Sequence, residues 1–207
     1  MKKIILSALA TSILSVSAFS YAGEDQFYVK TQVGGVKLDK VKSNSAKLKS
    51  TNTGFFGLGV GYYITDSIRA DLTYDYYANP SYKGTTQRNY TLKYKSQAST
   101  IMVNGFIDLF DADIIKIFAG TGVGVSMIST KTTLTFTNQA TATDKAKTQN
   151  NFAYALYLGV SKEFAPSINA DITYSYRDMG KFKKSQKNFS LGGIKGHHIS
   201  GGVRFDI

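Results

Sequence analysis

His198 and Ser200 are the residues whose types and spacing most suggest nucleophilic chemistry in this sequence. Two positions apart in an extended segment, they share one face, so the imidazole could activate the hydroxyl. Such a pair needs a third group that orients the histidine. The only acidic residue that follows is Asp206, at the far end of the same segment. We therefore expect no enzymatic activity from this pair.

Metal and cofactor chemistry has few residues to draw on. The sequence contains no cysteine, and its two histidines, His197 and His198, are adjacent. A thiolate zinc site and a cysteine nucleophile are therefore excluded, and the sequence has no glycine-rich phosphate-binding loop. We expect the protein to bind no metal and no cofactor.

The residues best suited to binding a partner are lysines. The chain has 25 Lys and Arg against 14 Asp and Glu, a formal net charge of +11. Most of this excess lies in four polar segments, 39–50, 79–97, 129–150 and 178–196. Clustered lysines attract acidic partners through long-range, salt-dependent steering. The residues expected to contact such a partner are Lys40, Lys42, Lys47, Lys49, Lys83, Lys181, Lys183, Lys184 and Lys187, with Phe182 and Phe189 interleaved.

The first 22 residues have the features of a secretory signal peptide. Lys2 and Lys3 precede a short apolar stretch, and Ser20-Tyr21-Ala22 forms a small-x-small cleavage site. We expect cleavage after Ala22, which leaves residues 23–207 as one exported domain. No other apolar run approaches 18 residues, which excludes a helical membrane span in the mature chain.

Apolar and polar residues alternate with period two along the mature chain, which predicts strands with one face in an apolar medium. In the last such segment, Ile199, Val203 and Phe205 share one face, while His198 and Arg204 share the other. An eighth segment lies between 90 and 107, but it is apolar on both faces at 101–103, and its parity stays open. The other alternating segments are 27–33, 55–62, 68–76, 117–127, 152–160 and 168–176.

The connections between these segments alternate in length. Short turns are expected at 64–67, 108–113 and 162–167, and long polar loops at 39–50, 79–88, 129–150 and 180–196. This asymmetry predicts an all-β, eight-stranded antiparallel up-and-down transmembrane β-barrel. A soluble eight-stranded barrel is the alternative. Unequal loops, tyrosines near strand ends and a polar face rich in glycine and charge all favour the membrane barrel.

The hairpin that spans residues 59–77 is repeated in the sequence. Residues 159–177 match it at nine of 19 positions, including Ala-Asp-x-Thr-Tyr-x-Tyr in both copies. Each copy reads as strand, short turn and strand, so we expect a duplicated hairpin.

The charges on the polar face predict a filled interior. An eight-stranded barrel is just wide enough for side chains to fill, and charges confined there persist only when they are paired. We therefore expect interior ion pairs rather than an open pore, and whether the barrel conducts ions stays open. The residues expected to form the pairs are Arg69, Asp71, Asp75, Asp171, Arg177, Arg204 and Asp206, all but Asp75 and Arg177 toward the short-turn end.

Four ordered motifs resemble those of small eight-stranded outer-membrane barrels of the OmpX, OmpA-barrel and opacity-protein type. The likeness covers the whole mature chain, although the family usually ends in phenylalanine and this chain ends in Ile207. Lipid A deacylases that share this fold also carry a His-x-Ser signature. The motifs are Phe27-Tyr28-Val29-Lys30, Gly57-Leu58-Gly59-Val60-Gly61-Tyr62, Ala119-Gly120-Thr121-Gly122-Val123-Gly124-Val125 and Gly202-Val203-Arg204-Phe205.

The resemblance implies a monomeric outer-membrane surface antigen or adhesin, inserted by the barrel-assembly machinery. The lysine-rich, arginine-poor composition is similar to that of rickettsial surface adhesins. Its basic extracellular loops would contact an acidic host-cell protein or glycan. Three alternatives stay open: a structural barrel whose lysines lie against outer-membrane lipid and lipopolysaccharide, a narrow channel, and a lipid A-modifying enzyme. Nucleic acid is not expected as a partner, because an exported barrel would rarely meet it.

Overall fold

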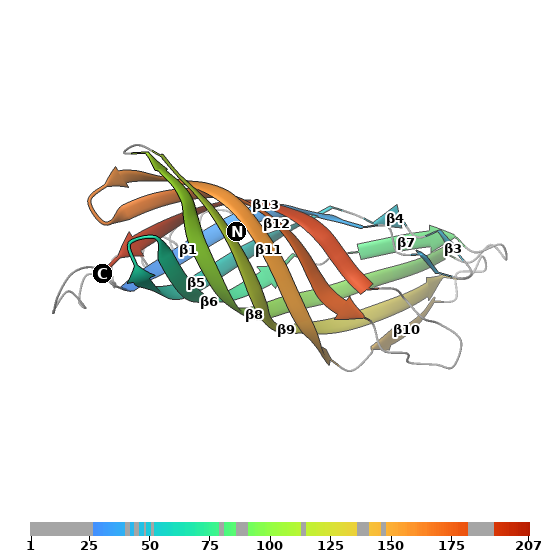
Figure 1. The fold of residues 1–207 in the computed structure, drawn as a ribbon. Helices are drawn as coiled ribbons and strands as arrows, with labels where there is room; N and C mark the ends of the chain where they lie inside the picture. Colours follow the sequence, from blue (N-terminus) through green and yellow to red (C-terminus); the bar gives the residue numbers. More distant parts are fainter. Residues whose placement is uncertain are drawn as a thin grey trace, which may run out of the picture.

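Eight long strands make up most of the chain in the computed structural model (Figure 1). The structure describes residues 27–39, 42–43, 46–47, 49–50, 52–78, 81–85, 91–112, 115–135, 141–145, 148–181 and 193–207. Within these residues no helix is long and apolar enough to cross a membrane. The long strands are β1 (Phe27–Leu38), β5 (Thr53–Thr65), β6 (Ile68–Tyr77), β8 (Thr91–Ala112), β9 (Ile115–Thr135), β11 (Gln149–Ala165), β12 (Ile168–Lys181) and β13 (Gly193–Asp206). The short strands are β2 (Lys42–Ser43), β3 (Ala46–Lys47), β4 (Lys49–Ser50), β7 (Ser81–Thr85) and β10 (Thr141–Lys145).

The eight long strands close into an antiparallel barrel. Each pairs with its neighbours along the chain, and β1 pairs with β13 from Tyr28↔Asp206 to Leu38↔Gly196, which closes the ring. Closure matters because hydrocarbon offers no hydrogen bonds to an open sheet edge. The eight-stranded up-and-down barrel that the sequence predicts is confirmed.

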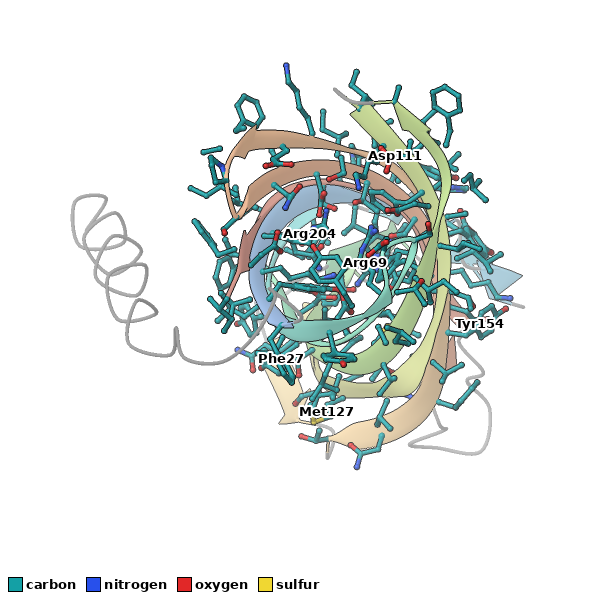
Figure 2. All side chains as sticks on the ribbon, turned by 60° about the vertical axis from the view of Figure 1, so that its left-hand side comes forward. Phe27, Arg69, Asp111, Met127, Tyr154 and Arg204 are labelled. Atoms are coloured by element: carbon teal, nitrogen blue, oxygen red, sulfur yellow. The ribbon has the colours of Figure 1, made fainter. Side chains whose placement is uncertain are left out.

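The side chains alternate between the lumen and the outer wall, as a closed membrane sheet requires. Figure 2 shows Arg69 and Arg204 inside the ring of strands, with Phe27 and Tyr154 outside it. An apolar outer band of this extent is stable only where the surrounding medium is also apolar. The exposed members of the band include Val33, Leu58, Val60, Leu72, Val103, Val123, Leu156, Leu158, Ile172 and Ile199.

The parity of β8, which the sequence leaves open, is resolved by burial. Ala98, Met102 and Phe106 are buried in the lumen, whereas Ile101 and Val103 are exposed on the outer wall. The run around Met102 is apolar on both faces because this part of the lumen is itself packed with apolar and aromatic side chains.

The repeated sequence unit forms the same hairpin twice. The β5–β6 and β11–β12 hairpins both turn at a two-residue connection, 66–67 and 166–167. Both also carry a register shift just before the turn, between Tyr63 and Thr65 in one and between Glu163 and Ala165 in the other. These turns lie at the short-turn end of the barrel.

At the opposite end, the prediction of long loops is partly wrong. β8 begins at Thr91, β9 continues to Thr135, and these two residues pair with each other. β7 and β10 extend the sheet on either side, and β4 pairs with β7, so the sheet projects beyond the barrel (Figure 1). Threonine favours strands, but a sheet that is polar on a solvated face lacks the apolar alternation that marks membrane strands. The predicted turn at 108–113 is also strand as far as Ala112.

Candidate functional site

The most deeply buried charges in the lumen are Asp75 on β6 and Arg177 on β12. Their side chains are 0% and 3% exposed, and the Arg177 Nη1 lies 2.5 Å from the Asp75 Oδ2. The other carboxylate oxygen accepts a hydrogen bond from the Gln32 Nε2 at 2.7 Å. Gly57 on the neighbouring strand makes room for this group, because a Cβ there would overlap the Asp75 carboxylate. The charge of each partner is therefore matched across the barrel.

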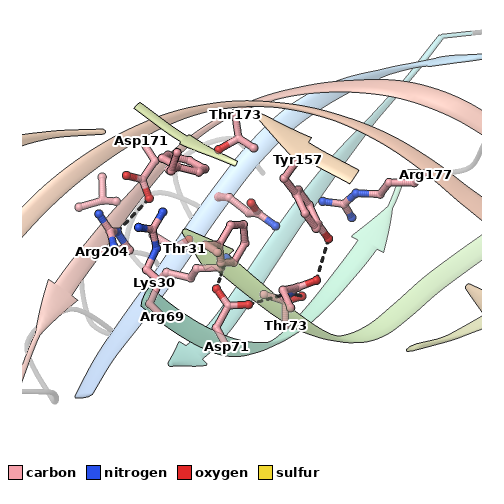
Figure 3. A pocket seen from close by; sticks show the side chains of 16 residues that line it. Lys30, Thr31, Arg69, Asp71, Thr73, Tyr157, Asp171, Thr173, Arg177 and Arg204 are labelled. Atoms are coloured by element: carbon pink, nitrogen blue, oxygen red, sulfur yellow. Dashed lines mark hydrogen bonds and ion pairs between the residues drawn. The ribbon is translucent and has the colours of Figure 1, made fainter. Parts of the chain in front are cut away.

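A second network surrounds Asp71 on β6. The Lys30 Nζ lies 2.5 Å from the Asp71 Oδ2, and the Tyr28 hydroxyl donates to the same oxygen at 3.1 Å. The Asn104 Nδ2 donates to the Asp71 Oδ1 at 2.6 Å, and the Tyr157 hydroxyl donates to the Asn104 carbonyl oxygen at 2.8 Å. Figure 3 shows Lys30, Asp71 and Tyr157 converging in the lumen from three different strands.

Arg69 lies nearer the short-turn end and is paired with Asp108 on β8. The Arg69 Nη1 is 2.6 Å from the Asp108 Oδ1. The guanidinium also lies over the rings of Phe106 and Phe118, at 5.0 and 4.5 Å from their centroids. Cation–π contacts of this kind retain a cation in an apolar part of the lumen.

Arg204 on β13 interacts with the two remaining charges predicted from the sequence, Asp171 and Asp206. Its Nε lies 3.0 Å from the Asp171 Oδ2, and its Nη2 donates to the Ser161 hydroxyl at 2.8 Å. Its Nη1 donates to the Tyr63 hydroxyl at 3.0 Å, and that hydroxyl in turn donates to the Asp206 Oδ1 at 2.9 Å. Asp206 is thus reached through a tyrosine.

All seven charged residues singled out in the sequence are placed on the lumen face by the structure. Their partners Lys30 and Asp108 were not foreseen, because strand alternation assigns a side chain to the lumen without indicating which side chain lies across it. The enclosed cavity between these groups measures about 20 Å³, which holds about one water molecule. A larger open cavity of about 780 Å³, lined by Tyr63, Asp66 and Glu163 among others, lies at the short-turn end.

His198 and Ser200, which suggested catalysis in the sequence, each contact other groups in the structure. His198 is fully buried and packs edge-on against Phe55 and Tyr77, with ring centroids 5.6 and 5.7 Å away. The Ser200 hydroxyl donates to the Thr173 carbonyl at 3.5 Å. No group of three or more acidic or histidine side chains among the described residues could hold a metal ion.

On the outer wall, an ion pair fixes the ends of β12 and β13 above the apolar band. The Lys195 Nζ lies 2.9 Å from the Asp178 Oδ2. Partial burial would raise the pKa of Asp178, but hydrogen bonds from Lys195 and the Gly180 amide outweigh it and hold that pKa below 3.8. The same hydrogen bond raises the pKa of Lys195.

Among the lysines predicted to contact a partner, those that the structure describes lie in strands at the end opposite the two-residue turns. Lys42 pairs with Lys47 across β2 and β3, and Lys49 pairs with Lys83 across β4 and β7. Lys181 is the last residue of β12. The remaining predicted positions, Lys40, Phe182, Lys183, Lys184, Lys187 and Phe189, lie outside the described residues.

The closed apolar-banded barrel and its paired polar lumen define the class of small outer-membrane β-barrels. The chain belongs to the outer membrane protein beta-barrel domain family, whose model matches residues 6–205. The protein therefore lies in the bacterial outer membrane.

Relatives that are similar in sequence align with this chain over the full length of both proteins. A Rickettsia conorii protein named "Putative adhesin" is 34% identical over 249 residues and covers 100% of both chains. A Rickettsia bellii protein with the same designation is 32% identical over 232 residues, again over 100% of both chains.

Solved structures share the fold at low sequence identity. The Neisserial surface protein A has a TM-score of 0.52 at 18% identity, covering 87% of this chain and 97% of its own. The Pseudomonas aeruginosa outer membrane protein OprG has a TM-score of 0.55 at 14% identity, covering 88% and 97%.

Proposed function

We propose that the protein is an outer-membrane adhesin whose basic outer end binds acidic partners on the host-cell surface. The observation that carries this proposal is the placement of the lysines. They concentrate in the segments at one end of the barrel, whereas the other end closes in two-residue turns. The designation of the full-length relatives supports the same function.

In this proposal the barrel is a rigid support for the binding segments and does not itself bind the partner. Its lumen is occupied by paired charges such as Asp75–Arg177 and Lys30–Asp71, and the cavity between these groups holds about one water molecule. The binding groups are therefore expected on the outside. Lysine carries a compact, strongly hydrated charge, so attraction to sulfate or carboxylate groups acts at long range and falls as salt increases.

The partner classes follow from this chemistry. We propose an acidic host-cell protein or a sulfated glycan as the external partner of Lys181, Lys183, Lys184 and Lys187, with Phe182 adding apolar contact. We also propose that lysines near the bilayer contact lipopolysaccharide, because anionic headgroups attract basic residues that lie at the membrane surface.

Assembly and chemistry complete the proposal. We propose insertion by the barrel-assembly machinery as a monomer. The pairing of β13 with β1, which closes the barrel, extends to Ile207, whose amide donates to the Phe27 carbonyl at 2.8 Å. We propose no enzymatic role, because the buried His198 packs between aromatic rings while Ser200 donates to a backbone carbonyl.

The test is binding of the refolded barrel to immobilised heparin, used as a sulfated-glycan probe, over a series of salt concentrations. The basic-segment variant combines Lys181→Gln, Lys183→Gln, Lys184→Gln and Lys187→Gln. The control combines Lys116→Gln and Lys162→Gln at the short-turn end. We expect binding that weakens steeply with salt, is lost in the basic-segment variant and is retained in the control. Heparin binding that does not change with salt concentration, or that the basic-segment variant retains, would contradict the proposal.

A further inference from the structure

On the outer wall of β1, β13 and β12, apolar residues give way to charged ones within four rows of paired residues. Ile172 and Ile199 are exposed in the inner two rows, which therefore face hydrocarbon. Charged and polar side chains occupy the outer two rows, which therefore lie at the level of the lipid headgroups. From the membrane centre outward the rows are Val33–Gly201–Ile172, Gly35–Ile199–Tyr174, Lys37–His197–Tyr176 and Asp39–Lys195–Asp178.

His197 is held in one orientation by contacts from both neighbouring strands. Its Nδ1 lies 2.6 Å from the Tyr174 hydroxyl, and its Nε2 lies 3.6 Å from the Asp39 Oδ1. An ionised carboxylate can only accept a hydrogen bond, so we assign the ring proton to Nε2 and the acceptor role to Nδ1. The ring also packs against Tyr176, with centroids 5.2 Å apart. Because the side chain is 46% exposed, the imidazole is ordered yet accessible to a ligand.

Lys37 supplies the cation of the same row. It pairs with His197 across β1 and β13 and is exposed, so the two side chains lie next to each other on the outer wall. Among the described residues no ion pair involves Lys37, whereas Lys195 in the row above is paired with Asp178 at 2.9 Å. A lysine at the hydrocarbon boundary keeps its methylene stem on apolar surface and extends its ammonium to the headgroups. Lys37 can therefore bind an anion that the lipid supplies.

On the hydrocarbon side of Lys37 the outer wall lacks side chains. Gly35, about 7 Å away along β1, pairs with Gly54 on β5, and Gly201 on β13 faces outward in the next row. A Cβ added at Gly35 or Gly201 would meet no group within 4 Å. Ile199, which is exposed, stands between Gly35 and the next strand. The three glycines therefore form a recess in the apolar band, which we call the glycine recess.

An exposed cation above an apolar recess fits an amphiphile. A water-soluble anion would contact Lys37 but could not enter a recess that faces hydrocarbon. An acyl chain that packs against glycine backbone, in contrast, gains dispersion contacts that a bulkier wall would prevent. The site lies at the end opposite the two-residue turns, which in outer-membrane barrels is the extracellular end. The matching ligand is therefore the anionic lipid of the outer leaflet, lipopolysaccharide.

We propose that Lys37 and His197 bind a phosphate group of lipopolysaccharide, and that the glycine recess receives one of its acyl chains. The ammonium supplies charge. At 3.6 Å the Asp39 carboxylate is too distant to accept a hydrogen bond from Nε2, which leaves this donor for the phosphate. The inference rests on the lipopolysaccharide contact proposed above, which it deepens by naming the residues, and it does not require the host partner.

The imidazole makes the site sensitive to pH. When the ring gains a second proton, Nδ1 becomes a donor and the Tyr174 hydroxyl turns to accept from it. The added positive charge lies beside Lys37 and strengthens the attraction for a phosphate as pH falls from about 8 to about 5. The titratable and charged groups that face His197 are Lys37 and Asp39 on β1, Tyr174 and Tyr176 on β12, and Lys195 on β13.

The test uses the refolded full barrel in phosphatidylcholine nanodiscs, titrated with lipopolysaccharide and with dephosphorylated lipopolysaccharide. Lys37→Gln removes the cation, and Lys37→Arg retains it. The matched control is Lys162→Gln, which removes an outer-wall lysine at the short-turn end, where its Nζ lies over the Phe164 ring. Gly35→Val fills the recess, and Gly105→Val is its control, because an added Cβ meets nothing within 4 Å at either exposed glycine. Heat-modifiable electrophoretic mobility verifies that each variant is folded.

We expect Lys37→Gln to weaken lipopolysaccharide binding about fivefold, the contribution of one lysine at an anionic surface, and Lys37→Arg to restore it. Gly35→Val should weaken binding about fourfold, because its side chain displaces about one methylene group of the acyl chain. Both controls should bind like wild type, and dephosphorylated lipid should bind wild type and Lys37→Gln equally. The ratio of wild-type to His197→Gln affinity should be larger at about pH 5 than at about pH 8.

Wild-type affinity in Lys37→Gln, or an equal loss in Lys162→Gln, would overturn the phosphate site. Wild-type affinity in Gly35→Val, or an equal loss in Gly105→Val, would overturn the placement of the acyl chain. An affinity ratio that does not change with pH would remove His197 from the site. If wild type binds both lipids equally, the proposed lipopolysaccharide contact fails together with this site. If wild type prefers the phosphorylated lipid but every variant binds like wild type, only this site is wrong. Heparin binding of the basic-segment variant tests adhesion separately.

Discussion

Replacing Asp75 by Asn removes the carboxylate from the most deeply buried ion pair while preserving its shape. Arg177 then keeps its charge, with the Ser175 and Tyr77 hydroxyls, each at 3.1 Å, as neutral acceptors. Its guanidinium also stays over the Phe55 ring, 5.3 Å from the centroid. None of these groups carries the negative charge that the carboxylate supplied at 2.5 Å.

The size of the effect follows from burial. Both side chains of the Asp75–Arg177 pair are almost inaccessible, and removing one partner of such a pair costs about 3–5 kcal/mol. The retained hydrogen bonds each contribute about 1 kcal/mol and are present before and after the change, so they do not offset the loss. We expect Asp75→Asn to lower the free energy of unfolding by about 3 kcal/mol or more.

The assay is reversible denaturant unfolding of the refolded barrel in lipid vesicles. The chain has no tryptophan and 14 tyrosines, so tyrosine fluorescence and far-ultraviolet circular dichroism report on the transition. Asp111→Asn is the matched control. Its ion pair with Lys116 spans 2.9 Å, but the two side chains are 55% and 39% exposed, so we expect a loss below about 1 kcal/mol.

A double-mutant cycle separates pairing from packing. Combining Asp75→Asn with Arg177→Gln removes both charges, so the double variant should be more stable than the sum of the single losses implies, by at least about 2 kcal/mol. Additive losses, or an Asp75→Asn barrel no less stable than the Asp111→Asn control, would refute the view that paired charges fill and stabilise the lumen.

Three further predictions concern packing, pH and chemistry. Gly61→Val places side-chain atoms where the Tyr28 ring lies, and we expect a loss of about 1–3 kcal/mol in the same unfolding assay. The hydrogen bond from Lys195 outweighs partial burial and holds the pKa of Asp178 below its ordinary value of 3.8. The stabilisation that this ion pair provides is therefore complete above pH 3.8 and is lost as pH falls through the lowered pKa. Midpoints of denaturant unfolding measured across acid pH would record the loss. Ser200→Ala should leave lipid A unchanged when the protein is expressed in the outer membrane, as mass spectrometry of extracted lipid would show.

Each of these predictions has a matched control or a contrary outcome. Gly35→Ala adds a Cβ in open space on the outer wall, so a loss equal to that of Gly61→Val would exclude the steric explanation. An Asp178→Asn barrel should lose part of the acid sensitivity, and an unchanged pH profile would speak against the ion pair. Shortened lipid A that depends on Ser200 would restore the enzyme hypothesis.

Alternation predicted the membrane strands because lipid constrains every second residue. Residues such as Leu72 and Leu158 must be apolar where they face hydrocarbon, and Arg69 and Asp75 on the other face must then lie in the lumen. The same reasoning fails for β8, where Met102 packs in an apolar part of the lumen, 4.0 Å from the Tyr157 hydroxyl. When both faces of a strand are apolar, its sequence does not indicate which face lies on the outer wall of the barrel.

The features missed in the sequence depend on contacts between distant strands. Lys30 and Asp71 lie on β1 and β6, which are separated by β5 in the sheet, so their ion pair spans a whole strand and does not follow from the pairing of neighbours. The projecting sheet was predicted as loops because neither of its faces meets hydrocarbon. Its strands are defined by the backbone pairing of β8 with β9 and of β7 with β8.

Attachment to host cells by otherwise non-adherent bacteria that display this protein is the most direct test of its proposed function. We predict that display increases attachment, that added salt or soluble heparin reduces it, and that the basic-segment variant, displayed at an equal level, abolishes it. Equal attachment by the wild type, the basic-segment variant and bacteria without the protein would contradict the conclusion that its basic outer end is an adhesive surface.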